Sequence, residues 1–373
     1  MSQVIKKRNI VIASVLKPVD DTRMFEKMAQ SLVETGRYEI HILGYPCRQI
    51  PNYPGVHFHP SMAFKRLSPY RLLIPFLSFV KAIQLEPSIV IITTHELLFF
   101  AWILKFVTGS KTVYDVRENY MRNILFLPTF SIFIRPLLAG YVRIKEVMNV
   151  PFISLFVLSD YGYKDEMIFM KKKSIVVENK VKKNSVRARR VNPTGRDIKL
   201  LFSGTLAEST GVFTAIELAR KLHAVDQSIV LEIIGYCSKR EVLTRIRKVI
   251  GPLPFIRLTG GDQLVPHDHI MQAISRAHFG IISYPPNPST RNTMPTKLFE
   301  YIGSFLPILL INHPYWVNQC RRYNAAIPFD ANEINAVDLL QKMRTGRFYN
   351  QQPSADIYWE NEAVKLTKAI SNI

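Results

Sequence analysis

Residues 292–303 read Asn-Thr-Met-Pro-Thr-Lys-Leu-Phe-Glu-Tyr-Ile-Gly, and they indicate the architecture of the chain more clearly than any other segment. Pro295 predicts the first turn of a short amphipathic helix, and the apolar residues 306–312 predict a buried strand after it. The start of a helix has unpaired N–H groups and a partial positive charge, to which Lys297 adds a full charge that suits a phosphate. Glu300, one turn further on, can accept hydrogen bonds from the hydroxyls of a ribose. The segment therefore predicts a nucleotide-binding helix, and an ordinary capped helix on the surface is the alternative.

Short apolar runs alternate with amphipathic runs along most of the chain. The predicted strands cover residues 10–16, 38–43, 89–93, 112–116, 154–158, 174–177, 199–203, 229–235, 255–259, 280–283 and 308–312. Most are rich in Val and Ile and apolar on both faces, which is typical of parallel strands between layers of helices. Repeated strand–helix units predict a doubly wound α/β fold.

Residues 181–197 interrupt this alternation with a polar, basic and turn-rich segment, which predicts a linker. The 373 residues are enough for two hydrophobic cores. We therefore predict two Rossmann-like domains, residues 1–180 and 198–355, whose parallel sheets face each other across a cleft. A ligand would bind outside the carboxyl ends of the strands.

The composition narrows the class of protein. The formal net charge of +20 favours anionic partners such as membrane phospholipid, a phosphorylated substrate or nucleic acid. The three cysteines are far apart in the sequence and fit neither zinc spacing nor a disulfide framework, which favours a reducing cytoplasm. The first residues lack the long apolar region of a signal peptide, and no apolar run reaches the ~20 residues of a spanning helix. We expect a cytoplasmic protein that is not integral to a membrane.

The Pro-x-Lys-Leu-x-Glu-Tyr pattern at residues 295–301 resembles the signature of family-four glycosyltransferases (glycosyl transferases group 1), which have the GT-B fold. Other segments resemble the family in the same order along the chain, namely residues 14–25, 94–96, 114–120, 204–211 and 356–362. The resemblance implies an acceptor-side N-terminal domain, a nucleotide-sugar-binding C-terminal domain and a closing helix at 356–373 that returns to the first domain. It also implies retaining transfer of a hexose from a nucleotide diphosphate to a saccharide or lipid-linked acceptor, in cell-surface glycan synthesis.

On the donor side, the resemblance implies that Glu300 holds the ribose. The family's glycine-containing loop carries an Arg and a Lys that neutralise the diphosphate, and Thr205 and Thr210 occupy these positions here. Arg291 and Lys297 are substitutes for the missing charge, and Asn292 replaces the first of the family's two Glu residues. The full donor-binding set is Gly204, Thr205, Thr210, Gly235, Tyr236, Gly260, Tyr284, Arg291, Asn292, Thr296, Lys297 and Glu300.

On the acceptor side, polar residues at successive strand ends should converge. The candidate catalytic residues are His95, Arg117 and Glu118, with Arg117 at a position where the family has His. Lys17, Arg23 and Asp115 complete the acceptor-side set. Asp21 or Thr22 is expected to cap the helix that follows, and Arg23 to face the cleft from its first turn. A structural role is the alternative for each of these residues.

The family uses no essential metal and no Asp-x-Asp motif is present, so we expect no cofactor. The expected partners are a nucleotide-diphosphate sugar, a saccharide or lipid-linked acceptor and an anionic membrane surface, with no nucleic acid. Peripheral binding to the inner face of a membrane is predicted by basic residues that lie among apolar ones, namely Lys65, Arg66, Arg71, Lys81, Arg135, Arg143 and Lys145.

Two alternatives remain open. A degenerate, non-catalytic GT-B protein that binds a nucleotide or sugar would explain the departures at Thr205, Thr210, Asn292 and Arg117. A nucleic-acid-binding protein would fit the sequence pI of about 9.8, although no recognisable nucleic-acid-binding motif is present.

Overall fold

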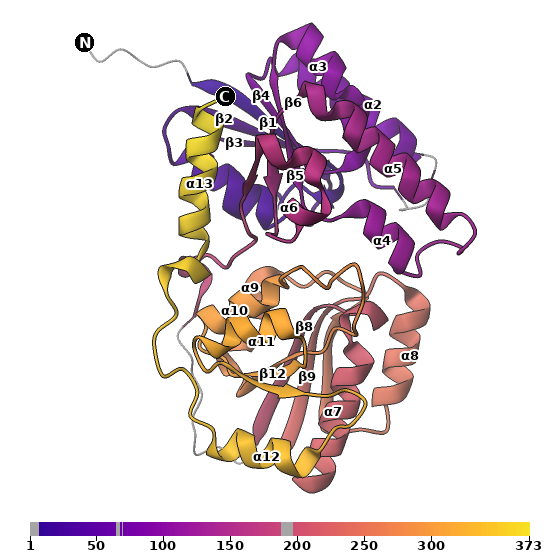
Figure 1. The fold of residues 1–373 in the computed structure, drawn as a ribbon, viewed down its shortest axis with the longest axis vertical. Coiled ribbons are helices and arrows are strands. Elements are labelled where there is room, and N and C mark those ends of the chain that lie inside the picture. The colour runs from indigo at the N-terminus through magenta and orange to yellow at the C-terminus, as the bar shows by residue number, and fades with distance from the viewer. Residues whose placement is uncertain (1–6, 65–67, 69, 188–196) are drawn as a thin grey trace. The chain divides into compact units, whose positions relative to one another are not determined.

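The computed structural model describes residues 7–64, 68, 70–187 and 197–373. The chain divides into two compact units (Figure 1). Unit 1 contains the described residues up to Asn179 together with Glu360–Ile373, and unit 2 contains Lys180–Trp359. The two units are described separately below.

Unit 1 is built on a seven-stranded sheet in the order β3-β2-β1-β4-β5-β6-β7, and every neighbouring pair is parallel. Its strands are β1 (Arg8–Pro18), β2 (Tyr38–Tyr45), β3 (Val56–Pro60), β4 (Ile89–Ile92), β5 (Lys111–Val116), β6 (Ile153–Leu158) and β7 (Ser174–Val176). Its helices are η1 (Arg23–Ala29), α1 (Gln30–Val33), α2 (Tyr70–Gln84), η2 (His95–Phe100), α3 (Ala101–Thr108), α4 (Tyr120–Phe126), α5 (Arg135–Asn149), η3 (Val150–Phe152), α6 (Tyr163–Glu166), η4 (Ile168–Lys173) and α13 (Trp359–Ser371). The reversal of strand order between β1 and β4 is the switch point of a Rossmann-like sheet.

Unit 2 repeats this plan with a six-stranded parallel sheet in the order β10-β9-β8-β11-β12-β13. Its strands are β8 (Ile198–Thr205), β9 (Ile229–Tyr236), β10 (Ile256–Gly261), β11 (Phe279–Ile282), β12 (Ile308–Ile311) and β13 (Ala326–Phe329). Its helices are η5 (Lys183–Ser185), η6 (Glu208–Thr210), α7 (Val212–Val225), α8 (Arg240–Ile250), α9 (His267–Arg276), α10 (Thr296–Gly303), α11 (Pro314–Arg321), α12 (Ala336–Thr345) and η7 (Ala355–Ile357). The switch point here lies between β8 and β11.

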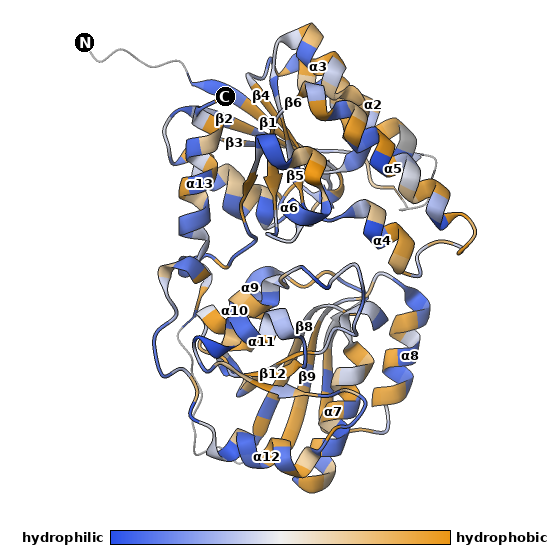
Figure 2. Cartoon of the chain, viewed as in Figure 1, coloured by the Kyte–Doolittle hydropathy of each residue, from blue (hydrophilic) through white to orange (hydrophobic). Residues whose placement is uncertain are grey.

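The strands form where the sequence is apolar on both faces. All four residues of β4, β11 and β12 are buried, as expected for central parallel strands covered by helices on both sides (Figure 2). Each strand predicted from the sequence is present, and the predicted α/β fold of two parallel sheets is confirmed.

Two strands were missed, and both lie at an edge of a sheet. β3 has the sequence Val-His-Phe-His-Pro, in which the histidines hide the apolar pattern. β13 contains Pro328, which argues against a central strand because proline cannot donate to the ladder. At an edge, one side of the strand needs no partner, so the proline is tolerated.

Helix α13 begins at Trp359, and its residues from Glu360 onward belong to unit 1. The side chain of Glu362 is fully buried, and its Oε2 accepts a hydrogen bond of 3.0 Å from the backbone N–H of Glu178. The end of the chain is thereby bonded to the segment that follows β7. Of the predicted linker, residues 188–196 lie outside the described part of the chain.

Candidate functional site

Three glycines form a row across the carboxyl ends of three neighbouring strands in unit 2. Gly235 of β9 pairs with Gly204 of β8 on one side and with Gly260 of β10 on the other. All three have positive φ angles, of 98° at Gly204, 157° at Gly235 and 86° at Gly260. A Cβ atom on Gly235 would lie 1.7 Å from the carbonyl oxygen of Gly204, so no other residue fits there. The row leaves the strand ends without side chains, which allows close approach to the backbone.

The loop between β8 and α7 is held by its own hydrogen bonds. The Thr210 hydroxyl shares its one proton between the carbonyl oxygens of Thr205, at 2.7 Å, and Ala207, at 2.9 Å, and it accepts from the N–H of Ala207 at 3.1 Å. Gly211 adopts the left-handed conformation before α7, and its carbonyl accepts a 2.8 Å hydrogen bond from the hydroxyl of Ser283. The structure therefore uses the Thr210 hydroxyl to shape the loop, in a position where we expected it to contact phosphate.

Lys297 is a buried cation in the first turn of α10. Its side chain is 6% exposed, and Nζ has no hydrogen-bond partner among the described residues. Nζ lies 4.4 Å from the ring centre of Phe202 and 5.0 Å from that of Tyr284. A Cβ atom built on Gly204 would lie 3.9 Å from this nitrogen, so the ammonium group lies beside the glycine row. Burial lowers the pKa of Lys297 to about 8, against the opposing attraction of Glu300.

Glu300 follows one turn later on the same helix. Its Oε1 lies 3.0 Å from Nε2 of His267, the first residue of α9, and both side chains are mostly buried. His267 thus bonds to the carboxylate that the sequence indicates as the ribose ligand. Sequence analysis missed it, because a histidine after Pro266 at the start of a helix gives no signal of a distant carboxylate.

The remaining donor-side candidates lie around this buried pair of charges. Thr205 is exposed at the end of β8, and Tyr236 is half-buried at the end of β9. Arg291 and Asn292 are exposed between β11 and α10, and Thr296 is the first residue of α10. Ser283, in the same connection, bonds to Gly211 and was not predicted.

Tyr284 is partly buried. Its ring meets that of Trp316 edge to face, with the ring centres 5.7 Å apart. Burial, with a further contribution from Glu300, raises the pKa of its hydroxyl well above the ordinary value. Tyr284 therefore places an uncharged aromatic ring beside the ammonium group of Lys297.

In unit 1, Arg23 lies in the core, although we expected it to face the cleft. Its side chain is 1% exposed, and its Nη2 lies 2.7 Å from Oδ1 of the fully buried Asp115. The same Nη2 also donates to the carbonyl of Val177 at 3.0 Å. The expectation of a cleft-facing Arg23 was wrong, because the guanidinium joins η1 to β5 and to the end of β7 inside the core.

Arg117 and Asp21 form a second ion pair next to the first. Nη2 of Arg117 lies 2.5 Å from Oδ1 of Asp21, and its Nε is 3.8 Å from Oδ2 of Asp115. Oδ1 of Asp21 also accepts hydrogen bonds from the N–H groups of Arg23 and Met24, as predicted for a capping residue. Despite the opposing effect of burial, Arg117 and Lys17 lower the pKa of Asp21, so this carboxylate is ionised.

His95 begins η2 directly after β4. Its Nδ1 lies 2.9 Å from Nζ of Lys145, and its Nε2 is 3.8 Å from Oε2 of Glu96. Burial lowers the pKa of His95 to about 4, and the charges of Lys145 and Arg71 contribute to this shift. His95 is therefore neutral at pH 7 and accepts a hydrogen bond from Lys145.

Glu118 is exposed, and its Oε2 accepts a hydrogen bond of 2.9 Å from Nδ2 of Asn123. Lys17 is partly exposed after the core of β1. Unit 1 thus brings Asp21, Arg23, Asp115 and Arg117 together in one network, while His95 belongs to a separate group with Lys145 and Glu96.

No group of three or more His, Cys, Asp or Glu side chains is arranged to hold a metal ion in the described residues. None of the helices in the described part of the chain is long and apolar enough to cross a membrane.

No protein-family model and no curated protein sequence matches the chain. Solved structures match it over nearly the whole length. Sucrose-phosphate synthase from Thermosynechococcus elongatus is similar with a TM-score of 0.74 and 11% sequence identity, over 98% of this chain and 99% of that protein. HepE from Anabaena, in complex with UDP-glucose, is similar with a TM-score of 0.65 and 12% identity, over 98% of this chain and 100% of HepE. A trehalose-6-phosphate structure from E. coli, bound with UDP-2-fluoro glucose, has a TM-score of 0.59 and 13% identity, over 98% and 96%.

These similarities, together with the two parallel sheets, show that the chain has the two-domain, Rossmann-like GT-B fold that the sequence predicts.

Proposed function

We propose that this chain is a retaining glycosyltransferase of the hexosyltransferase type. It would move a sugar from a nucleotide diphosphate to a saccharide or lipid-linked acceptor. The observation that carries the proposal is the ammonium group of Lys297, which is buried without a hydrogen-bond partner among the described residues. A buried charge is costly unless an anion or hydrogen bonds compensate it, and a diphosphate supplies both.

The surroundings of Lys297 support a nucleotide donor. Lys297 lies in the first turn of α10, where the partial positive charge of the helix N-terminus adds to that of the ammonium group. Glu300 lies one turn further on, where its carboxylate can accept hydrogen bonds from a ribose. The row of glycines at Gly204, Gly235 and Gly260 keeps side chains away from the strand ends, so that the donor can approach the backbone.

The chemistry requires stabilisation of the leaving diphosphate. Lys297 and the N-terminus of α10 would offset the charge that develops on it, in a position that is already shielded from water. In retaining transfer of this type, the leaving phosphate can itself take the proton of the acceptor hydroxyl. The proposal therefore needs neither a side-chain base nor a metal ion, and His95 and Glu118 are assigned to acceptor contacts.

The names of the structural neighbours favour a uridine nucleotide as the first donor to test, since HepE is described with UDP and UDP-glucose. A role in cell-surface glycan synthesis at the inner face of a membrane is part of the proposal. The basic composition and the exposed apolar helices of unit 1 support it.

A degenerate GT-B protein that binds a nucleotide without transferring sugar is the second candidate. It is favoured by the loop between β8 and α7, where the Thr210 hydroxyl is used internally and the only charged side chain is Glu208. A loop of this kind offers the diphosphate backbone N–H groups and no cation.

A thermal-shift screen against UDP, GDP, ADP, CMP and their sugar conjugates tests donor binding. A ligand that binds only the folded state raises the melting temperature with its concentration. We expect one nucleoside diphosphate to do so, and Glu300→Ala to weaken that shift. Glu241→Ala, an exposed glutamate on α8, is the matched control and should leave the shift unchanged.

Transfer is separated from binding by incubating the protein with the donor that it binds and following release of the nucleoside diphosphate. Release that depends on Lys297 would support the transferase. Binding without any release, with or without saccharide acceptors, would support the degenerate protein. Unchanged donor affinity in Glu300→Ala would contradict the ribose assignment.

A further inference from the structure

Helix α5 carries its largest apolar residues on the side that faces solvent. Leu137, Tyr141, Ile144 and Met148 are all exposed, and their spacing of four, three and four residues places them on one stripe of the helix. The buried side contains the smaller apolar residues Ala139 and Val142 together with the polar Glu146 and Asn149. A surface helix of a globular protein normally has the opposite arrangement, with polar residues outward.

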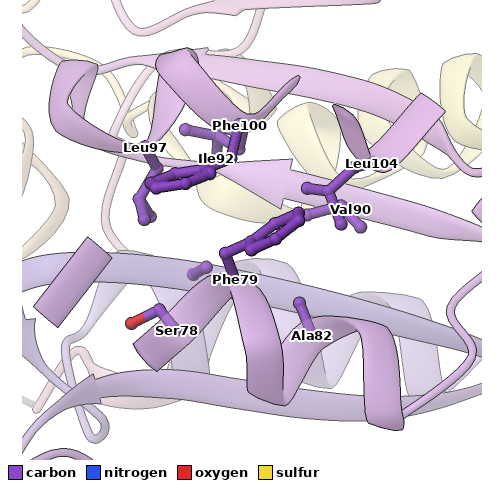
Figure 3. Close-up of a pocket in the computed structure, with 9 residues that line it drawn as sticks. Ser78, Phe79, Ala82, Val90, Ile92, Leu97, Phe100 and Leu104 are labelled. Carbon is purple, nitrogen blue, oxygen red and sulfur yellow. The ribbon is translucent and has the colours of Figure 1, made fainter. Parts of the chain in front are cut away.

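Helix α2 shows the same outward stripe, with Leu73, Phe76, Leu77 and Val80 exposed. The opposite side of α2 is apolar as well. Phe79 and Ala82 line a small pocket against the sheet, together with side chains from β1, β4, η2 and α3, and Ser78 is the one polar residue in this lining (Figure 3). A helix that is apolar on both sides is typical of an element covered on both sides.

The exposed apolar residues of α2, α3 and α5 lie on neighbouring helices of unit 1. Helix α3 contributes Trp102 and Phe106, and it contacts α2 and η3. Helix α5 contacts η2, which runs directly into α3, so the three helices form one layer (Figures 1 and 2). Of the 28 large apolar side chains that are exposed in the described residues, 18 lie between residues 70 and 148. Exposed apolar side chains are therefore concentrated in this part of the chain.

The connection from α4 to α5 extends the region with a charge-free loop, Leu-Pro-Thr-Phe-Ser-Ile-Phe-Ile at residues 127–134. Phe133 is 91% exposed, between the exposed Ile132 and Ile134. We call this loop and the outward stripes of α2, α3 and α5 the apolar face.

The charges on the apolar face are positive. Helices α2 and α3 contain Arg71, Lys81 and Lys105 and no acidic residue. The single acidic residue of α5 is Glu146, which is buried, and burial raises its pKa to about 7. A second copy of this chain would bring another net charge of +20 to the face, so charge complementarity favours an anionic occupant.

The sequence suggested several basic residues for contact with a membrane surface. Three of them are instead bonded to neighbouring side chains of unit 1. Lys145 lies 2.9 Å from His95, Arg71 pairs with Glu96, and Nη2 of Arg143 donates to Asn119 at 3.1 Å. Lys105 is exposed beside Phe106 and is the best-placed cation on α3. Lys65 and Arg66 lie outside the described residues.

We propose that the apolar face docks on the surface of a bilayer that contains anionic phospholipid. The apolar stripes would enter the boundary between headgroups and acyl chains, and the cations beside them would contact the headgroups. Trp102 and Tyr141 suit this boundary, because their rings are apolar at one end and polar at the other. Each helix has at most 15 residues, so it would lie on the membrane and not cross it.

The test is flotation of the full chain with vesicles of phosphatidylglycerol and phosphatidylcholine, compared with vesicles of phosphatidylcholine alone. We expect strong binding to the anionic vesicles and at least about tenfold weaker binding to the neutral ones, with a decrease at high salt. Phe133→Asp with Leu137→Asp should reduce binding at least about tenfold, because both side chains are exposed and the change replaces apolar contacts by charge. Lys105→Glu should reduce binding to anionic vesicles alone.

Val337→Asp with Val364→Asp is the matched control, since both valines are exposed outside the apolar face, at 64% and 65%. This control should bind vesicles like the parent protein. Equal binding of the Phe133/Leu137 variant would overturn the proposal, and so would failure to bind anionic vesicles. A dimer without lipid that the same variant dissociates would also overturn it, in favour of an interface between copies. Nucleotide binding does not require the vesicle, so a failure here leaves the donor proposal standing.

Discussion

Nε2 of His267 lies 3.0 Å from Oε1 of Glu300, and this contact joins the first residue of α9 to the second turn of α10. The carboxylate is therefore oriented before any ligand arrives. A preoriented acceptor costs less to order on binding than a mobile one.

We predict that His267 positions Glu300 for the donor. His267→Ala should weaken binding of the nucleoside diphosphate about tenfold, since it removes a hydrogen bond to a charged group. His267→Gln should restore part of the affinity, because its amide N–H can donate to the same oxygen. Calorimetric titration with UDP or the nucleotide found in the screen measures the effect. Equal affinity of the parent and the alanine variant would remove His267 from the site.

Lys297→Met should make the ligand-free protein more stable and abolish diphosphate binding. Burial lowers the pKa of Lys297 from 10.5 to about 8, so the unfolded chain binds more protons between these pH values. Above pH 10.5 Lys297 is neutral in both the folded and the unfolded protein and costs no stability. The free energy of unfolding then decreases as the pH falls from 10.5 to about 8. Replacing the ammonium by an apolar side chain should then stabilise the protein at pH 7 by about 3 kcal/mol. Denaturant unfolding at pH 7 measures it, and a destabilised variant would contradict the prediction.

Diphosphate affinity should depend on pH through the same residue. A bound anion favours the protonated form of Lys297, so binding should take up protons near pH 8 and weaken as the pH rises above it. Titration at pH 8.5 in buffers of different ionisation enthalpy detects the uptake. In Lys297→Arg the side chain stays charged, so the proton uptake should disappear even if some affinity remains. Uptake that persists in this variant would come from another group.

Gly235→Ala should be strongly destabilising. Its Cβ would lie 1.7 Å from the carbonyl oxygen of Gly204, at a φ angle of 157° that side chains rarely adopt. The strand must shift, at a cost of more than about 3 kcal/mol. Gly140→Ala is the control, because nothing lies within 4 Å of its added Cβ and alanine favours the interior of α5. Unfolding midpoints that fall equally in both variants would rule out the steric explanation.

The buried pair of Arg23 and Asp115 should be sensitive to single replacements. Asp115→Leu leaves the guanidinium of Arg23 without its carboxylate in the core, which should cost about 3–5 kcal/mol. The double variant Arg23→Met with Asp115→Leu should recover much of this loss, because neither charge is then buried alone. Chemical unfolding of the parent protein, the single variants Arg23→Met and Asp115→Leu, and the double variant gives the coupling. Additive losses would mean that the two side chains act independently.

The fold could be predicted from local patterns of apolar and polar residues. Strands such as β4 and β12 are apolar at every position, and a strand of this kind is stable only between two layers of helices. The edge strands were harder to predict, because an edge tolerates His57, His59 and Pro328 that a central strand would not. The resemblance at residues 295–301 then specified which doubly wound fold to expect, and the solved structures confirmed it.

The part of the site that could be predicted consists of residues whose positions follow from short stretches of sequence. Lys297 and Glu300 share one helix, so their spacing alone places both near its first turn. The glycines at the ends of β8, β9 and β10 were also visible as strand ends, since neighbouring parallel strands end at one edge of a sheet.

Contacts between residues that are far apart in the sequence could not be predicted, because the packing of the helices and strands determines them. Whether Arg23 faces solvent or pairs with Asp115, 92 residues away, depends on how η1 lies against β5. His267 meets Glu300 only because α9 and α10 pack at the same end of the sheet, and Leu137 is exposed only because α5 turns Val142 and Glu146 inward. Local periodicity determines helices, strands and their apolar stripes, whereas the direction in which a stripe or a charge points is set by long-range contacts that no short pattern contains.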